Sequence, residues 1–301
     1  MNIRIRAAVA LTVTLLIWAS FLVVTRAAMN ARLGPIEVGL IRFGIGTLFF
    51  LPVLLKRGVF PPGAKMASLL LIPGLGGIAF ILLLSAGLQI APVADSGVFT
   101  PSMLPLYVAL LSAIFLGERF TGLRMIGFAL IVTGALAVGG WVALSESGTG
   151  IWRGHLYFTA ASISWAAYTI GFRRSGMSAI DAGAFMCFWS AVGLGILALF
   201  VGVDFSGIPT RTLVTQMFFQ GFLSGFVATF TYFYSVTNLG ASRTAAFAAL
   251  VPVMAALGGW YFLGENIDAA KGAGILVVAV GVALASGAIT GRKRRAQNLA
   301  N

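Results

Sequence analysis

Long runs of apolar residues, separated by short polar stretches, recur along the whole 301-residue chain. A helix that crosses the hydrocarbon core of a bilayer needs about 20 predominantly apolar residues. Runs of that length predict ten membrane-spanning helices, at residues 7–28, 36–55, 67–89, 95–116, 121–143, 154–172, 182–202, 212–237, 243–262 and 269–289. The connections between them are short, so no soluble domain fits between the predicted spans.

The composition supports a lipid environment for these helices. Hydrophobic residues make up 59% of the chain and charged residues only 9%, and the mean hydropathy is +0.99. A soluble protein of this length could not cover so much apolar surface with polar groups. The pattern predicts an all-α, multi-pass membrane protein without an ATP-binding module, since no G-x-x-x-x-G-K-[ST] stretch occurs.

The net charge of +12 is distributed unevenly between the two ends of the predicted spans. The N-terminus, the alternate loops and the C-terminus hold 14 of the 20 Lys and Arg residues, and the opposite ends hold five. This positive-inside asymmetry predicts that both termini are cytoplasmic and that the protein lies in the inner (cytoplasmic) membrane. The basic tail at 291–298 could bind nucleic acid, but after a hydrophobic span it is typical of an orientation anchor, and we expect no nucleic-acid partner.

The four letters FLGE occur twice, at 115–118 and 262–265, and they belong to a longer repeat. When residues 104–138 are laid on 251–285, nine of 35 positions are identical without a gap. The same shift of 147 residues pairs Trp18-Ala19 with Trp165-Ala166 near the other end of the repeat. One constant shift over this length indicates that the chain is a duplication.

The repeat unit contains five predicted helices, and five is odd. Each helix of the first copy therefore has a partner that crosses the membrane in the opposite direction. We expect two inverted five-helix repeats, at 1–146 and 147–301, which together form one membrane unit. Inverted repeats are typical of secondary transporters, which expose a central site to each side in turn.

Several prolines are candidate hinges of such a movement. Proline inside a helix removes a backbone hydrogen bond and bends the helix, and in transporters the freed carbonyls can line a cavity. Pro101 and Pro105 fall in the fourth predicted helix, and Pro252, the repeat partner of Pro105, falls in the ninth. We predict that these three residues act as hinges, against the alternative that the kinks are merely tolerated.

The acidic residues favour structural roles over proton transport. Thr121 and Asp268 follow the two FLGE segments as candidate helix caps. Glu118 and Glu265 precede those helices, where the positive end of the helix dipole favours a carboxylate. Asp95 is also predicted to be a helix N-cap, although its place near the centre leaves a proton site open.

Other residue types give little sign of metal or cofactor chemistry. Cys187 is the single cysteine and His155 the single histidine, so we expect no metal site and no cofactor. Arg42 is the one charge several residues inside a span, and an intramembrane charge is a functional candidate. Snorkelling, bonding to backbone carbonyls and contact with substrate all remain open for it.

Aromatic residues at matched or helical spacing predict a solute-binding surface. Such a surface suits a planar or hydrophobic solute with a polar end or a drug cation, although aromatic residues can also face lipid. The predicted substrate-binding residues are Trp18, Phe80, Phe99, Met103, Tyr107, Trp165, Tyr168, Phe230 and Tyr234.

With its two FLGE segments, each preceded by a matched proline, and the Arg-Phe pair at 42–43, the chain resembles the EamA-type drug/metabolite transporters over residues 7–289. The WAAY stretch at 165–168 resembles the exporters of aromatic amino acids within that group, the YddG-like proteins. This resemblance implies export of amino acids from the cytoplasm by alternating access. The alternative is an exporter of drugs or quaternary cations, and a channel or a membrane enzyme fits less well. We expect a small-molecule substrate and either a monomer or a homodimer.

Overall fold

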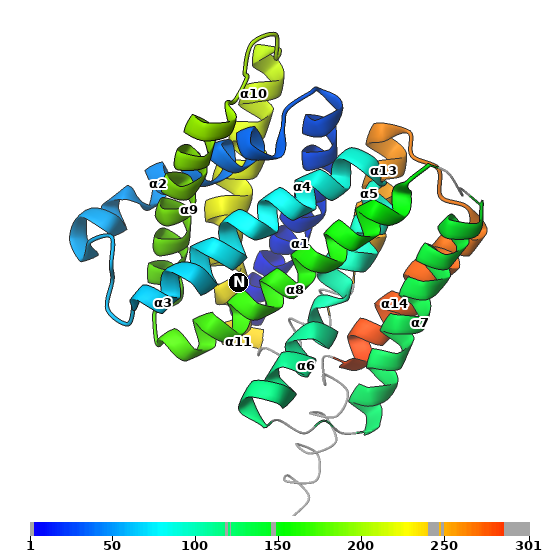
Figure 1. Cartoon of the computed structure of the whole chain (residues 1–301). Coiled ribbons are helices and arrows are strands. Elements are labelled where there is room, and N and C mark those ends of the chain that lie inside the picture. The colour runs from blue at the N-terminus through cyan, green and yellow to red at the C-terminus, as the bar shows by residue number, and fades with distance from the viewer. Residues whose placement is uncertain are drawn as a thin grey trace, which may run out of the picture.

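The structure is a computed structural model that describes residues 3–117, 120, 122–145, 149–239, 247 and 250–285. All secondary structure in these residues is helical (Figure 1). The helices of the first half are α1 (Ile3–Asn30), α2 (Pro35–Arg57), α3 (Met66–Leu69), η1 (Leu70–Ala79), α4 (Phe80–Ile90), α5 (Val93–Gly97), η2 (Val98–Ser102), α6 (Leu104–Leu116) and α7 (Gly122–Ser145). Those of the second half are α8 (Ile151–Ser175), α9 (Ala179–Val201), α10 (Thr210–Gln216), η3 (Met217–Val227), α11 (Ala228–Leu239), α13 (Val251–Leu263) and α14 (Ala269–Ala285).

Large apolar side chains cover much of the outer surface. Leu55, Leu199 and Phe200 are 78%, 85% and 84% exposed, which fits contact with lipid and not with water. By length and composition, five of the described helical stretches can cross a membrane: Ile3–Asn30, Pro35–Arg57, Met66–Ile90, Val93–Phe115 and Ala179–Val201. An all-helical membrane protein is confirmed, while the crossing of all ten segments and the side of the termini stay predictions.

The shift of 147 residues that relates the sequence halves also relates their backbones. The π-helical segments η1 and η3 begin at Leu70 and Met217, which are 147 residues apart. The helices α6 and α13 begin and end at equivalent residues, and each is followed by a left-handed glycine, Gly117 or Gly264. The duplication therefore extends to helix breaks and helix ends.

Equivalent helices of the two halves run antiparallel, as inversion requires. In the packed pair α7 and α14, Gly127 lies against Gly281, and Gly134 lies against Gly274 (Figure 1). Each added Cβ would meet backbone of the other helix at 2.4–3.1 Å, so glycine is what allows this close approach. Residue numbers therefore rise along α7 in the direction in which they fall along α14, so the two helices are antiparallel.

The pair α2 and α9 shows the same direction. Gly39 lies against Leu194, Gly46 against Cys187, and Gly183 against Phe50. Between these two equivalent pairs, α1 packs on α11 and α13, and α8 packs on α4 and α6. The helices that surround the middle of the molecule therefore come from both halves.

Candidate functional site: an aromatic centre and an ion-pair cluster

Four aromatic side chains meet in the middle of the molecule, and we call them the aromatic centre. The rings of Trp18 on α1 and Trp165 on α8 lie edge to face at 6.2 Å. Tyr232 of α11 lies 5.2 Å from Trp18, and Phe80 of α4 lies 5.0 Å from Trp165. Two of these helices belong to each half of the chain.

The contact between Trp18 and Trp165 fixes where the centre lies. These two residues are repeat partners, 147 positions apart. Two equivalent residues can touch each other only close to the pseudo-two-fold axis that relates the halves. The aromatic centre therefore lies on this axis, where a transporter built from inverted repeats binds its solute.

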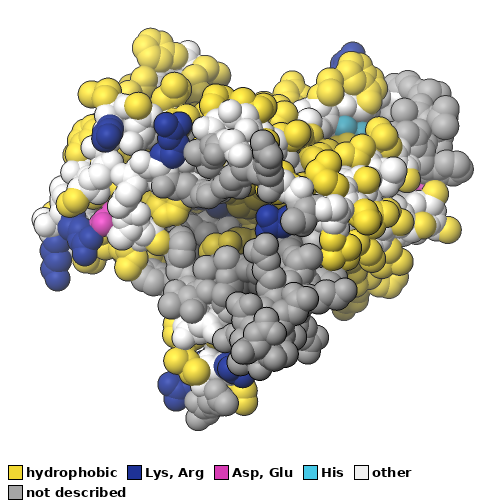
Figure 2. Space-filling model, turned by 90° about the horizontal axis from the view of Figure 1, so that it is seen from below, with side chains coloured by type: hydrophobic (Ala, Val, Ile, Leu, Met, Phe, Trp, Pro, Cys, Tyr) yellow, Lys and Arg dark blue, Asp and Glu magenta, His cyan; other side chains and the backbone are white. Residues whose placement is uncertain are grey.

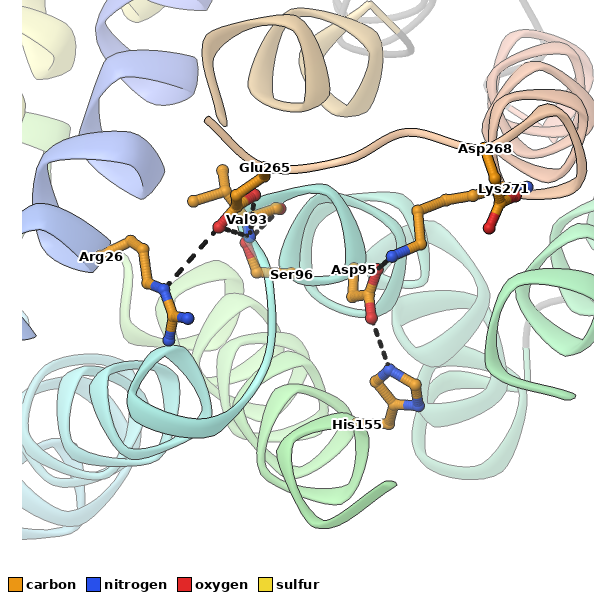
Figure 3. Close-up of polar contacts among 8 residues, drawn as sticks. All are labelled: Arg26, Val93, Asp95, Ser96, His155, Glu265, Asp268 and Lys271. Atoms are coloured by element: carbon orange, nitrogen blue, oxygen red, sulfur yellow. Dashed lines mark hydrogen bonds and ion pairs between the residues drawn. The ribbon is translucent and has the colours of Figure 1, made fainter. Parts of the chain in front are cut away.

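Charged side chains from both halves meet near one end of the bundle (Figure 3). We call Arg26, Asp95, His155, Glu265 and Lys271 the ion-pair cluster. The Asp95 carboxylate lies 3.0 Å from the Lys271 ammonium and 2.8 Å from Nε2 of His155. Arg26 Nε lies 3.7 Å from Glu265 Oε1. Because Asp95 is fully buried, its charge depends on these partners.

Glu265 holds the beginning of a helix in the opposite half. Its two carboxylate oxygens accept the backbone N–H of Val93, the first residue of α5, at 3.1 and 2.9 Å. Burial raises the pKa of the Glu265 carboxyl above its ordinary value. The Val93 hydrogen bond and the Arg26 guanidinium lower this pKa, but the effect of burial is larger. The Glu265 carboxylate thereby gives a hydrogen-bond acceptor to the Val93 N–H, which has no partner within α5 because it lies in the first turn.

Every side-chain contact among the cluster residues joins the first half to the second. Arg26 and Asp95 belong to the first repeat, and His155, Glu265 and Lys271 belong to the second. The halves cannot separate at this end without breaking all three contacts. Removing one partner of a buried ion pair typically costs about 3–5 kcal/mol, so the cluster holds this end closed.

The opposite end of the molecule is hollowed. A shallow groove of about 430 Å³ runs along the exposed face of the first half of α1, lined by Arg4, Ile5, Ala8, Val9, Thr12 and Val13. Arg26 lies at least 13 residues further along α1, about 20 Å away. Viewed from below, the molecular surface also shows a hollow near its middle (Figure 2). Ion pairs therefore join the two halves at one end, and the surface is hollowed at the other.

The structure brings three of the predicted substrate-binding residues together, namely Trp18, Phe80 and Trp165. It places Phe99 elsewhere, with its ring stacked on His155 at 4.5 Å. Met103 and Tyr107 pack in the core cluster formed with α7 and α14.

The remaining three predicted residues lie away from the aromatic centre or outside the description. Tyr168 packs over Gly76 of η1 and stacks with Phe172 at 6.4 Å. Tyr234 is 39% exposed, and the side chain of Phe230 lies outside the described residues. Their contact with a solute stays a prediction.

The candidate hinge prolines all lie at interruptions of the helices. Pro101 lies within η2, and Pro105 and Pro252 lie in the first turns of α6 and α13. The fourth predicted span is therefore three consecutive segments, α5, η2 and α6, and not one α-helix. Carbonyls in such segments find side-chain donors, as when Ser164 donates to Leu75 O of η1 at 2.8 Å.

The predicted helix caps have different outcomes. Asp268 caps α14 by accepting the backbone N–H of Lys271 at 2.7 Å, which confirms the prediction. The prediction for Asp95 is wrong, because Pro92 is the N-cap of α5 and Asp95 pairs with Lys271 and His155. Glu118 and Thr121 lie outside the described residues.

The comparison with known families agrees with this geometry. The model of the EamA-like transporter family matches the chain twice, at residues 5–140 and 152–287. The chain belongs to the EamA-like transporter family. The two matches begin 147 residues apart, which is the shift found in the sequence and in the helices.

Curated relatives of this EamA-like transporter are also transporters. The uncharacterized transporter YoaV of Bacillus subtilis is 23% identical over 89% of this chain and 92% of its own length. A probable terminal-alkyne amino-acid exporter of Streptantibioticus cattleyicolor is 24% identical over 97% of both chains. The inner membrane transporter YedA of Escherichia coli K12, uncharacterized as well, is 25% identical over 88% of this chain and 86% of its own.

A solved crystal structure superposes with a TM-score of 0.64 at 18% identity, covering 93% of this chain and 95% of the other. At that identity the likeness shows the fold alone. The family and the relatives together make this protein a multi-pass membrane transporter of small molecules and not an enzyme.

Sequence reasoning did not find most of the ion-pair cluster of this EamA-like transporter. Arg26, His155 and Lys271 come from three different helices, and their pairing depends on how those helices pack. Their rarity in the sequence could have indicated them. Each is a charged or titratable residue within a turn or two of the end of an apolar run. Tyr232 was missed because Tyr234 fits the four-residue spacing of the aromatic stripe.

Proposed function

We propose that this protein is a secondary transporter that exports small solutes by alternating access across the cytoplasmic membrane. The favoured substrates are amino acids with aromatic or hydrophobic side chains. The observation that carries the proposal is an aromatic centre on the axis between inverted halves, which ion pairs between the halves close off at one end.

The direction of transport follows from the charge distribution. On the predicted topology the hollow end is cytoplasmic and the ion-pair cluster faces outward. A solute would reach Trp18 and Trp165 from the cytoplasmic end, and it would leave at the opposite end when the cluster separates. The name of the Streptantibioticus relative supports the amino-acid class, since that relative is a probable exporter of an amino acid.

The aromatic centre also favours a second candidate class, hydrophobic organic cations. The four rings can hold a quaternary cation by cation–π contact, which needs no carboxylate. A cation exporter would use the same pathway and the same alternating movement, so the two classes differ only in the chemistry of the solute.

Binding and counterflow measurements test the proposal with the full-length protein. Purified transporter is heated with L-phenylalanine, L-tryptophan, L-leucine, L-propargylglycine or tetraphenylphosphonium. A substrate should raise Tm in a concentration-dependent way, because it binds the folded state alone. The same solute should then show saturable counterflow in proteoliposomes.

The outcomes separate the candidates. Stabilisation and counterflow by an amino acid support the favoured class, and the same results with tetraphenylphosphonium alone support the cation exporter. Flux that rises linearly with concentration would indicate a channel and contradict a carrier mechanism.

A further inference from the structure

A single guanidinium lies inside the bundle between the aromatic centre and the ion-pair cluster. Arg42 is the eighth residue of α2, about 10 Å from the start of the helix. Nine residues later on the same helix, the exposed Leu51 lies on the opposite face. The Arg42 side chain therefore points toward α1 and η3 and away from the lipid-exposed stripe.

The contacts of Arg42 leave its charge without an anion among the described residues. One terminal nitrogen donates to Ser224 Oγ of η3 at 2.9 Å. The guanidinium carbon lies 4.4 Å from the centroid of the Phe21 ring on α1. The Nε–H has no hydrogen-bond partner, and the ion pairs of the described residues do not include this arginine.

The layer next to Arg42 holds a second unsatisfied polar group. Gln220, four residues before Ser224 on η3, is fully buried, and its amide donates to Thr25 Oγ1 at 2.7 Å. Its carbonyl oxygen has no partner among the described groups. A carboxylate beside the guanidinium would satisfy Arg42, and an ammonium group would satisfy the free Gln220 carbonyl.

The position along α1 connects this layer to the solute pathway. Trp18 and Phe21 are three residues apart and lie on one face of the helix. Along α1, the Arg42 layer therefore lies between Trp18 of the aromatic centre and Arg26 of the ion-pair cluster. The ion-pair cluster at Arg26 closes the path beyond it.

A half-buried cation with no counter-ion among the described residues is costly to maintain, and an intramembrane charge is a functional candidate by default. The alternative is that Phe21 and Ser224 hold Arg42 for structural reasons alone. That alternative leaves the unpaired Nε–H unexplained, although a carboxylate accepts two parallel N–H groups from a guanidinium in the arrangement that Arg favours.

We propose that Arg42 is the subsite for the carboxylate of the transported solute, with the aromatic centre holding its side chain. This inference rests on the proposed function and narrows it to solutes that carry a carboxylate. It disfavours the cation exporter, since Arg42 would repel a cation one turn beyond the rings.

Competition between each amino acid and its amide tests this subsite. The probes are L-phenylalanine, L-tryptophan and L-leucine, each compared with its carboxamide for binding to the full-length transporter. Wild-type protein should bind at least one acid about tenfold or more tightly than its amide, since the amide loses the charge-assisted pair. This comparison needs no variant and therefore does not depend on the folding of one.

Two substitutions assign the preference to Arg42. In R42Q the ratio of acid to amide affinity should fall to within about twofold, and in R42K it should be intermediate because lysine keeps the charge without the planar fork. R211Q, which removes an exposed arginine, is the matched control and should keep the wild-type ratio. A purely structural role would change stability but would leave the ratio unchanged.

The results distinguish this inference from the proposed function. Equal binding of acid and amide by wild type, or an unchanged ratio in R42Q, overturns the Arg42 subsite and leaves the transporter proposal standing. Binding of neither member of any pair contradicts the amino-acid class, and the subsite falls with it.

Discussion

At the scale of single residues, the proposed function places solute binding at two tryptophans that touch across the pseudo-axis. Trp18 and Trp165 come from equivalent positions of the two halves and lie at 6.2 Å. An aromatic surface shared in this way can stay in contact with a solute while each half moves. Both side chains belong to helices that pack against the opposite half.

Replacing Trp165 with leucine should weaken binding of the best solute about tenfold. The variant keeps an apolar side chain but loses the stacking surface and the contacts with Trp18 and Phe80. The Tm shift at fixed solute concentration reports the loss. W260L is the matched control, since Trp260 is 56% exposed on α13, and it should bind within about twofold of wild type. Equal losses in both variants would contradict the assigned centre.

The sequence predicted part of this site. The constant shift of 147 residues identified Trp18 and Trp165 as equivalent, and their contact follows once both helices lie at the axis. The role of Asp95 could not be derived, because its partners Lys271 and His155 are 176 and 60 residues away along the chain. Only the packing of α5 against the second half brings them together.

At the scale of helices, the proposed transport cycle requires the ion-pair cluster to break when the molecule opens at the cluster end. It joins α1 and α5 of the first half to α8, α14 and the α13–α14 connection of the second (Figure 3). Glu265 lies in that connection, and Arg26, Asp95 and Lys271 are the charged groups that act on its pKa.

Opening of this end should become easier as pH rises through the titration of Glu265. Burial raises the pKa of this carboxyl above its ordinary value of 4.5 in the closed state, and water would return it to that value in the open state. Opening therefore releases a proton between the two values, so a higher pH favours the open state there. The rate at which an impermeant maleimide labels S96C in a C187S background measures the opening.

The E265Q variant is the control for this effect. Glutamine cannot titrate, so the ratio of labelling rates between the Glu265 protein and E265Q should rise with pH across that window. Using a ratio removes the pH dependence of the thiol itself. A ratio that stays constant with pH would show that Glu265 does not control the opening.

The helices were the most predictable feature of the protein, and their interruptions the least. Each predicted span coincides with a described helical stretch to within a few residues over the part that the structure describes. The π-helical segments η1 and η3 were not foreseen, since a change in hydrogen-bond register leaves no apolar periodicity to detect. The prolines indicated the bends but not that the fourth span is divided into three segments.

At the scale of the whole molecule, the antiparallel packing of equivalent helices is the feature on which the proposed alternating access depends. In an inverted architecture each half can take up the arrangement that the other half has here. Exchanging the two arrangements would open the cluster end and close the hollow, which is the movement expected of inverted repeats. The duplicated sequence predicted this architecture because five helices per copy force the inversion.

A reversible disulfide across the closed end tests alternating access most directly. A Cβ placed on Gly97 of α5 would lie 3.5 Å from the Cβ of Ala255 on α13, a separation that suits a disulfide. In a C187S background, oxidised G97C/A255C protein should lose solute counterflow in proteoliposomes and regain it on reduction, while each single-cysteine variant keeps transporting. Undiminished counterflow with the disulfide fully formed would contradict the account, because the halves would then not need to separate at this end.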